Sequence, residues 1–270
     1  STLMRSSAAS DVYKRQPADF QRLAPSFTVS LQPWQEQLLF LRLMYKSTFR
    51  MPTFNDLYYY RLGNRSLRPE KANEYNMGIT WSRSFSSFLN YLSVTVDGYY
   101  NDVTDKIVAF PTTYAWKMAN YGKVHVTGMD ATLAAAASLG KNTVLVVSGG
   151  YTWQKAIDLT DATSKSYKDQ LPYTPKHSGN VSAVLEMPWV NVGYSIVGVS
   201  ERYSMSQNIP ENRIDGYMEH TVSLSRNFSF RHCKLRLQAE IINLTDTQYD
   251  VIKYYPMPGR SWRLTGTIEF

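Results

Sequence analysis

The sequence has 270 residues, a single cysteine and no long hydrophobic run. Cys233 alone can form neither an intrachain disulfide nor a cysteine-based metal site. No segment approaches the about eighteen consecutive apolar residues that indicate a membrane-spanning helix. These absences do not exclude membrane crossing by β-strands, because only about half of the residues in such a strand are apolar and face lipid.

The sequence also lacks a basic stripe. Its formal net charge is +7, but lysine and arginine residues are scattered singly along the chain. Nucleic-acid-binding domains instead gather their basic residues on one face or in one run. We therefore expect no nucleic-acid partner.

Catalytic motifs are missing as well. The chain contains no HExxH, no GxSxG and no phosphate-cradling glycine-rich motif. Its four histidines are not at metal-ligand spacing: they are His125, His177, His220 and His232. Asp158, Asp161 and Asp169 share one polar segment, but their spacing is not that of an EF-hand. We expect no catalytic residue, no bound metal and no cofactor.

The last ten residues, SWRLTGTIEF, show what the sequence does contain. Trp262, Leu264, Gly266, Ile268 and Phe270 alternate with polar residues. Successive side chains of a strand point to opposite faces, so this segment predicts a strand with one apolar and one polar face. A terminal strand of this length that ends in Phe is what an outer-membrane β-barrel needs to complete its wall.

The same alternation recurs throughout a chain rich in tyrosine, which favours β structure. It predicts about eleven strands, most of them ten to fifteen residues long. Tight turns and long polar segments alternate between them. The expected strands cover residues 22–32, 37–48, 71–82, 91–100, 123–137, 142–154, 177–187, 190–203, 217–227, 233–244 and 261–270.

Strands in globular proteins average only about five or six residues. Long strands joined by short turns at one end and long loops at the other are typical of a transmembrane antiparallel β-barrel, so the fold class we predict is all-β. A soluble β-sandwich or propeller remains an alternative, but it would lack this asymmetry between its two ends.

The alternation of connections also predicts an orientation. If the carboxyl terminus is periplasmic, all long segments are extracellular and all tight turns are periplasmic. Single-chain bacterial barrels close with an even number of strands, so about eleven strands predict a fragment. Residues 1–16 read as a non-native, adaptor-like tail, which leaves residues 17–270 as the barrel segment.

Several motifs resemble the carboxyl-terminal half of TonB-dependent outer-membrane receptors, in particular the cobalamin and ferric-siderophore group. They recur in the order and spacing of that family, with Asp130 where relatives commonly carry Glu. The motifs are FRMPTFNDLYY at 49–59, LRPE at 67–70, NEYNMG at 73–78, NYGKV at 120–124, LPYTPKH at 171–177, INLTDTQY at 242–249 and PGRSW at 258–262.

The resemblance implies a barrel of 22 strands, of which this chain would supply about eleven, and a plug domain upstream of it. It implies active import of a scarce nutrient, cobalamin or a ferric siderophore or haem, with no bond broken in the ligand. The implied partners are this small organometallic ligand, TonB through an upstream segment, the barrel-assembly machinery, and outer-membrane lipid with lipopolysaccharide, whose phosphates would also account for the basic charge.

Aromatic residues in the expected outer loops are the candidate ligand contacts, because their rings can stack on a corrin, haem or catechol. They are Tyr58, Tyr59, Tyr60, Tyr114, Trp116, Tyr254 and Tyr255. A second group lies near strand ends and predicts interface girdles: Trp34, Trp81, Phe85, Trp153, Trp189, Phe228 and Phe230. In the terminal strand, Trp262, Leu264, Ile268 and Phe270 are the residues we associate with barrel assembly.

Three alternatives remain open at this point. A passive porin would lack a plug domain. An outer-membrane barrel enzyme would bring His177, His220 and outer-loop aspartates together at one rim. A soluble β binding module would be found in the periplasm and not in outer-membrane fractions.

Overall fold

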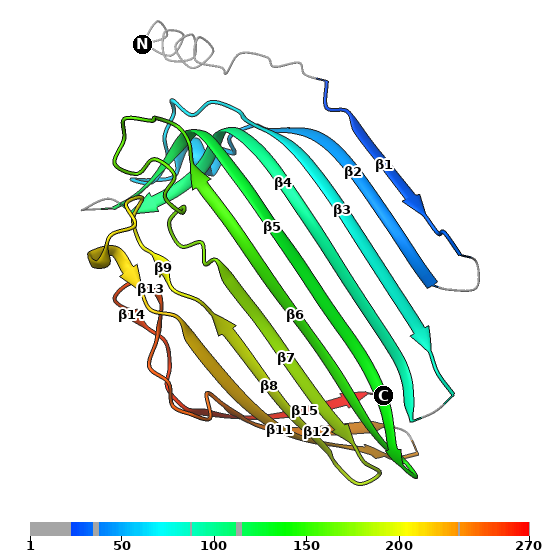
Figure 1. Ribbon diagram of the computed structural model, residues 1–270. Helices are drawn as coiled ribbons and strands as arrows, with labels where there is room; N and C mark the ends of the chain where they lie inside the picture. Colours follow the sequence, from blue (N-terminus) through cyan, green and yellow to red (C-terminus); the bar gives the residue numbers. More distant parts are fainter. Residues whose placement is uncertain (1–22, 35–37, 87, 112–114, 232, 270) are drawn as a thin grey trace, which may run out of the picture.

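The computed structural model describes residues 23–34, 38–86, 88–111, 115–231 and 233–269. Within them, eleven strands form one antiparallel sheet, which is strongly curved and has β1 and β15 as its edges (Figure 1). The strands are β1 (Ser26–Leu31), β2 (Leu38–Arg50), β3 (Glu70–Ser84), β4 (Leu89–Pro111), β5 (Trp116–Gly140), β6 (Thr143–Asp158), β7 (His177–Glu186), β8 (Asn191–Val199), β11 (Tyr217–Ser229), β12 (Lys234–Ile242) and β15 (Ser261–Glu269). None of the helices in these ranges is both long and apolar enough to cross a membrane.

The period-two pattern gives the sheet two different faces. In the β12–β15 pair, Leu235 is opposite Ile268, and Arg236 is opposite Thr267. Neighbouring strands keep this register, so apolar residues share one face, called here the apolar face, and most polar residues share the other, the polar face. Large side chains on the apolar face are left without protein cover: Trp262 is 74% exposed and Leu264 is 80% exposed. A face this apolar and this exposed fits lipid and does not fit water.

The connections differ between the two ends of the sheet. At one end, the turn end, β6 follows β5 after two residues, and Asn142 in that turn has a φ of 64°. The other end, the loop end, carries α2 (Phe54–Tyr58), β9 (Arg202–Tyr203), the 3-10 helix η1 (Pro210–Asn212), β10 (Arg213–Ile214), β13 (Asp250–Ile252) and β14 (Tyr255–Pro256). Figure 1 shows β9, β13 and β14 gathered there. The predicted asymmetry of the connections is confirmed, with one exception.

The exception lies between the strands expected at 91–100 and 123–137, where the sequence predicts a long loop at about residues 104–122, and this prediction is wrong. β4 runs on to Pro111 and β5 begins at Trp116, so the two strands form a long hairpin that projects at the loop end. Its extension holds because Ile107 and Met118 are buried against Leu67 from the loop after β2. The sequence pattern missed this hairpin because cover by another loop is a tertiary effect.

The buried core lies near the loop end. One cluster joins Val103, Val124, Val126, Ala156 and Leu171, and it includes the fully buried Val124. These residues come from the polar-face positions of β4, β5 and β6 and from the loop after β6. The inner side of the wall therefore has a buried apolar cluster where loops cover it.

Candidate ligand-binding surface

The loops at the loop end bond to one another and form a layer over the polar face. The loop after β2 docks on β5, because the Met118 N–H donates to the Leu62 carbonyl (2.9 Å) and the Asn64 amide donates to the Met118 carbonyl (3.0 Å). The loop after β6 is joined to the loop after β8, because the Gln170 N–H donates to Asn208 Oδ1 (2.8 Å).

Within the first loop, α2 begins at a capping box. The Asp56 N–H donates to Thr53 Oγ1 (3.2 Å), and the Thr53 N–H donates to Asp56 Oδ2 (2.9 Å). Arg50 adds a 2.9 Å ion pair to the same carboxylate. Burial raises the pKa of Asp56, but the hydrogen bonds from Thr53 and the charge of Arg50 outweigh it and hold the pKa below its usual value. Residues Phe54–Tyr58 of the FRMPTFNDLYY motif therefore form a short, capped helix.

Arg202 joins the loop after β8 to the loop after β12. Its side chain is buried, with 4% of its residue surface exposed, and Nη2 donates to the carbonyls of Asp250 (2.6 Å) and Val251 (3.0 Å). Its guanidinium lies 5.8 Å from the ring centre of Tyr217. No carboxylate of the described residues forms an ion pair with it. Arg202 therefore fixes the position of β13 through backbone carbonyls.

Two aromatic contacts lie at the loop end. The rings of Tyr217 and Tyr249 stack at 3.9 Å, and the Tyr249 hydroxyl donates to Glu219 Oε2 (2.5 Å). Burial, followed by the Glu219 carboxylate, raises the pKa of Tyr249, so this phenol remains protonated. Trp116 and Tyr173 form the second contact, with their ring centres 5.6 Å apart.

The predicted ligand contacts fall into separate groups. Tyr58, Tyr59 and Tyr60 are exposed at α2 and just after it, and Tyr254 and Tyr255 are exposed in the β13–β14 hairpin. No ring contact joins these two groups among the described residues. Trp116 packs on Tyr173, and Tyr114 lies outside the described residues. The structure brings the described members of this group to the same end of the sheet, on different loops.

The polar face below the loops is lined with bonded charges. Arg42 forms a 2.9 Å ion pair with Asp97, which is paired across the sheet with Asp130. The Thr152 hydroxyl donates to Asp130 (2.7 Å). The inner wall of β2 to β6 is therefore hydrophilic.

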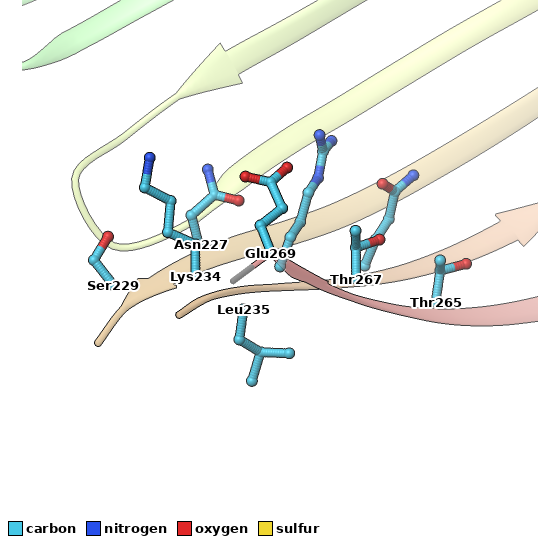
Figure 2. A pocket seen from close by; sticks show the side chains of 9 residues that line it. Asn227, Ser229, Lys234, Leu235, Thr265, Thr267 and Glu269 are labelled. Carbon is cyan, nitrogen blue, oxygen red and sulfur yellow. The ribbon is translucent and has the colours of Figure 1, made fainter. Parts of the chain in front are cut away.

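Nearer the turn end, the same face carries a hollow of about 550 Å³ on β11, β12 and β15. Figure 2 shows the side chains of Asn227, Lys234, Thr265 and Glu269 rising from one side of the strands, while Leu235 points to the other side. The terminal strand thus has the two faces that its sequence predicts. Of its assembly residues, Trp262, Leu264 and Ile268 are exposed on the apolar face, and Phe270 lies outside the described residues.

The residues of the catalytic alternative are not brought together. His177 and His220 lie on the apolar face, where their Nδ1 atoms are 2.7 Å from the hydroxyls of Tyr151 and Tyr194 respectively. The aspartates of the loop after β6 bond elsewhere: Asp158 to Thr160 N, Asp161 to Thr163 N and Asp169 to Asn208 N.

Sequence reasoning missed the residues that hold the loop layer. Asn243, in the INLTDTQY motif, is fully buried with a φ of 54°, and its amide bonds both N and O of Thr247 at 2.9 Å. Arg202 and Gln170 are likewise buried polar residues. A single polar residue within a polar segment gives no periodic signal. The one signal available for Asn243 is that an Asn before a turn is a recognisable turn residue.

A curved antiparallel sheet with a lipid-suited outer face, a hydrophilic inner face and a loop layer at one end defines the wall of a membrane β-barrel. Residues 5–244 match the family model described as "TonB dependent receptor-like, beta-barrel". The chain belongs to this family, whose members are outer-membrane receptors and not enzymes.

Individual relatives agree with this assignment. The chain is 26% identical over 230 residues to "Vitamin B12 transporter BtuB" of Photobacterium profundum, covering 82% of this chain and 34% of that protein. It is 24% identical over 233 residues to the protein of the same name from Vibrio vulnificus, covering 82% of this chain and 33% of that protein. The chain thus spans about a third of the length of these relatives.

Solved structures share the fold. The ferric citrate transporter FecA superposes with a TM-score of 0.69 and 16% identity, covering 90% of this chain and 37% of that chain. The siderophore receptor PiuA from Acinetobacter baumannii gives a TM-score of 0.66 and 19% identity, covering 90% and 35%.

Proposed function

We propose that the intact protein containing this barrel segment actively imports an organometallic nutrient, cobalamin or a ferric siderophore or haem, across the outer membrane. The observation that carries the proposal is the loop layer, which presents exposed aromatic rings at one end of a hydrophilic wall. Tyr254 and Tyr255 stand on a hairpin that Arg202 holds in place. Vitamin B12 transporters among the relatives and a siderophore receptor among the similar structures support this ligand class.

The proposal includes the partners and the orientation of the barrel. Residues 17–270 form the barrel segment, residues 1–16 are a non-native tail, and the loop end is extracellular while the carboxyl terminus is periplasmic. TonB supplies the energy through a segment upstream of this chain. The barrel-assembly machinery recognises the terminal strand through Trp262, Leu264, Ile268 and Phe270, and lipopolysaccharide surrounds the loop end.

Growth of a strain that lacks the intact gene tests the nutrient assignment. On limiting cobalamin, haem or ferric siderophore as the single source, the deletion strain grows poorly on one of them, and the intact gene restores growth. Unimpaired growth on every one of these sources would refute the assignment. Uptake that persists in a complemented strain after the proton gradient is collapsed would support a passive porin.

Variants then test the aromatic contacts. Replacing both Tyr254 and Tyr255 with Ala removes two exposed rings, and loss of stacking costs about tenfold in affinity for the imported nutrient. Phe230→Ala is the matched control, because Phe230 is an exposed ring at the turn end. Equal affinities of the double variant and the control variant would refute the role of these tyrosines.

A further inference from the structure

The apolar face carries a groove that the hydrogen-bonded pair of Tyr151 and His177 lines on one side. Its floor is a pair of glycines, Gly179 on β7 and Gly198 on β8, which are directly opposite each other. In the same cross-strand row, Tyr151 of β6 pairs with Gly179, and Met218 of β11 pairs with Gly198. Two glycines between two large side chains leave a trough of about 480 Å³, within the range of small-molecule sites.

The trough needs glycine at one position and tolerates a side chain at the other. A Cβ on Gly179 would lie 2.9 Å from the backbone oxygen of Gly150, so no side chain fits there without a backbone shift. A Cβ on Gly198 would lie 3.7 Å from Met218, an ordinary contact. A larger residue at position 198 would therefore fill the trough from its floor without breaking the sheet.

Polar groups flank the trough. His177 lies at the loop end of the trough, where its Nδ1 is 2.7 Å from the hydroxyl oxygen of Tyr151. His220 lies one cross-strand row from Gly198 toward the turn end, and its Nδ1 is 2.7 Å from the hydroxyl oxygen of Tyr194. Both bonds use Nδ1, and no other hydrogen bond to either imidazole ring is found in the described part of the chain. Nε2 of each ring therefore keeps its capacity to bond a neighbouring molecule.

The strands around the trough carry charge of one sign on their apolar face. Lys155 is exposed on the apolar face of β6, two residues beyond Trp153, which pairs with His177. The register places no Asp or Glu on the apolar face of β6, β7, β8 or β11 in the described residues. An anionic group near Lys155 and His177 would meet a cation and a ring nitrogen.

We propose that this trough binds one molecule of the phosphorylated, acylated glycolipid of the outer leaflet, with an acyl chain over Gly179 and Gly198 and a phosphate at Lys155 and His177. The location of the trough on the apolar face selects an acyl chain, and the basic group above it selects an anionic headgroup. The choice of the outer leaflet rests on the orientation proposed above, in which the loop end is extracellular.

Lipid retention by the intact receptor tests the site. The receptor is stripped of lipid in dodecyl maltoside and incubated with purified bisphosphorylated lipid A, and bound lipid is counted by native mass spectrometry. The wild type retains one lipid A. Gly198→Leu fills the trough and Lys155→Gln removes the cation, and each weakens retention about tenfold, since a charged hydrogen bond or a buried chain segment contributes at least that factor.

Gly266→Leu is the matched control. Gly266 also lies on the apolar face, on β15, and its Cβ would lie 3.6 Å from Leu237, so the substitution adds the same bulk away from the trough. It is expected to retain lipid A as the wild type does. Equal retention by Gly198→Leu and Gly266→Leu would overturn the proposal.

The source of the lipid is tested with phosphatidylglycerol as a second probe. Retention of lipid A at least about tenfold above phosphatidylglycerol supports the outer-leaflet glycolipid, whereas equal retention of the two lipids refutes it. The binding assay contains no nutrient, and nutrient uptake is measured separately. If the receptor takes up the nutrient but does not prefer lipid A, the lipid site alone is refuted. If it retains lipid A selectively but takes up no nutrient, the import function alone is refuted.

Discussion

Asn243 is expected to hold the loop after β12 through its buried side chain. Its amide makes two 2.9 Å bonds to Thr247 and a longer one of 3.5 Å to the Pro258 carbonyl, and its backbone is left-handed, with a φ of 54°. Asn243→Gly loses two net hydrogen bonds of about 1 kcal/mol each. Gly adopts this φ freely and adds no strain, so the substitution destabilises the loop by about 2 kcal/mol. Asn243→Ala adds about 1 kcal/mol or more of left-handed strain.

Amide hydrogen exchange in the intact receptor measures this effect. A local loss of about 2 kcal/mol makes exchange in residues 244–258 about thirtyfold faster in Asn243→Gly, and exchange in Asn243→Ala is faster again. Asn142→Gly is the control, because Asn142 also has a positive φ, 64°, but lies in the turn between β5 and β6. If Asn243→Gly changes exchange in residues 244–258 no more than Asn142→Gly does, the side-chain bonds do not hold the loop.

Three further predictions concern the loop layer and the wall. Asp56→Asn weakens α2 at pH 7: because the folded pKa of Asp56 is lowered, its stabilisation is present above about pH 4 and is lost as the pH falls through the folded value. Exchange-corrected protection of residues 53–63 should therefore fall below about pH 4 in the wild type and stay flat in the variant; parallel curves would contradict this. Arg202→Lys loses the double contact to Asp250 and Val251 and speeds exchange in residues 250–252 about tenfold, whereas an unchanged rate would show that β13 is held by other contacts. Gly128→Ala places a Cβ 2.4 Å from the Tyr99 ring. We expect it to destabilise the folded barrel by about 1–3 kcal/mol, measured by thermal unfolding. Adding Tyr99→Ala recovers part of that loss only if the Tyr99 ring is the obstacle.

The strands could be predicted from the sequence because apolar and polar residues alternate along each strand of a membrane barrel. The alternation around Leu235 and Arg236 is the same signal as the cross-strand register that the structure shows. All eleven predicted strands are present, and their ends shift by a few residues, apart from the β4–β5 hairpin. That hairpin extends because Leu67, from a distant loop, covers Ile107, and no local pattern contains this contact.

The candidate site was less predictable than the wall. Composition and loop position identified exposed rings such as Tyr254 but not the buried groups that place them. The pairing of His177 with Tyr151 was also missed, because these residues are 26 positions apart and meet only through the register of β6 and β7. Sequence reasoning therefore reached the faces of the strands and the identity of the loops, and it did not reach contacts that depend on register or on loop docking.

The loop layer separates the residues that hold a loop from the exposed residues that we propose as ligand contacts. Asn243 and Arg202 are buried, and their side chains bond backbone atoms. Changing either residue leaves these backbone atoms without a hydrogen-bond partner and disturbs the whole loop. Tyr254 and Tyr255 are exposed on the hairpin that these anchors position, so changing them leaves the anchors bonded. Such a division lets the exposed positions vary with the ligand while the wall and the loop backbone stay the same, which is how one barrel architecture can serve receptors of different specificity.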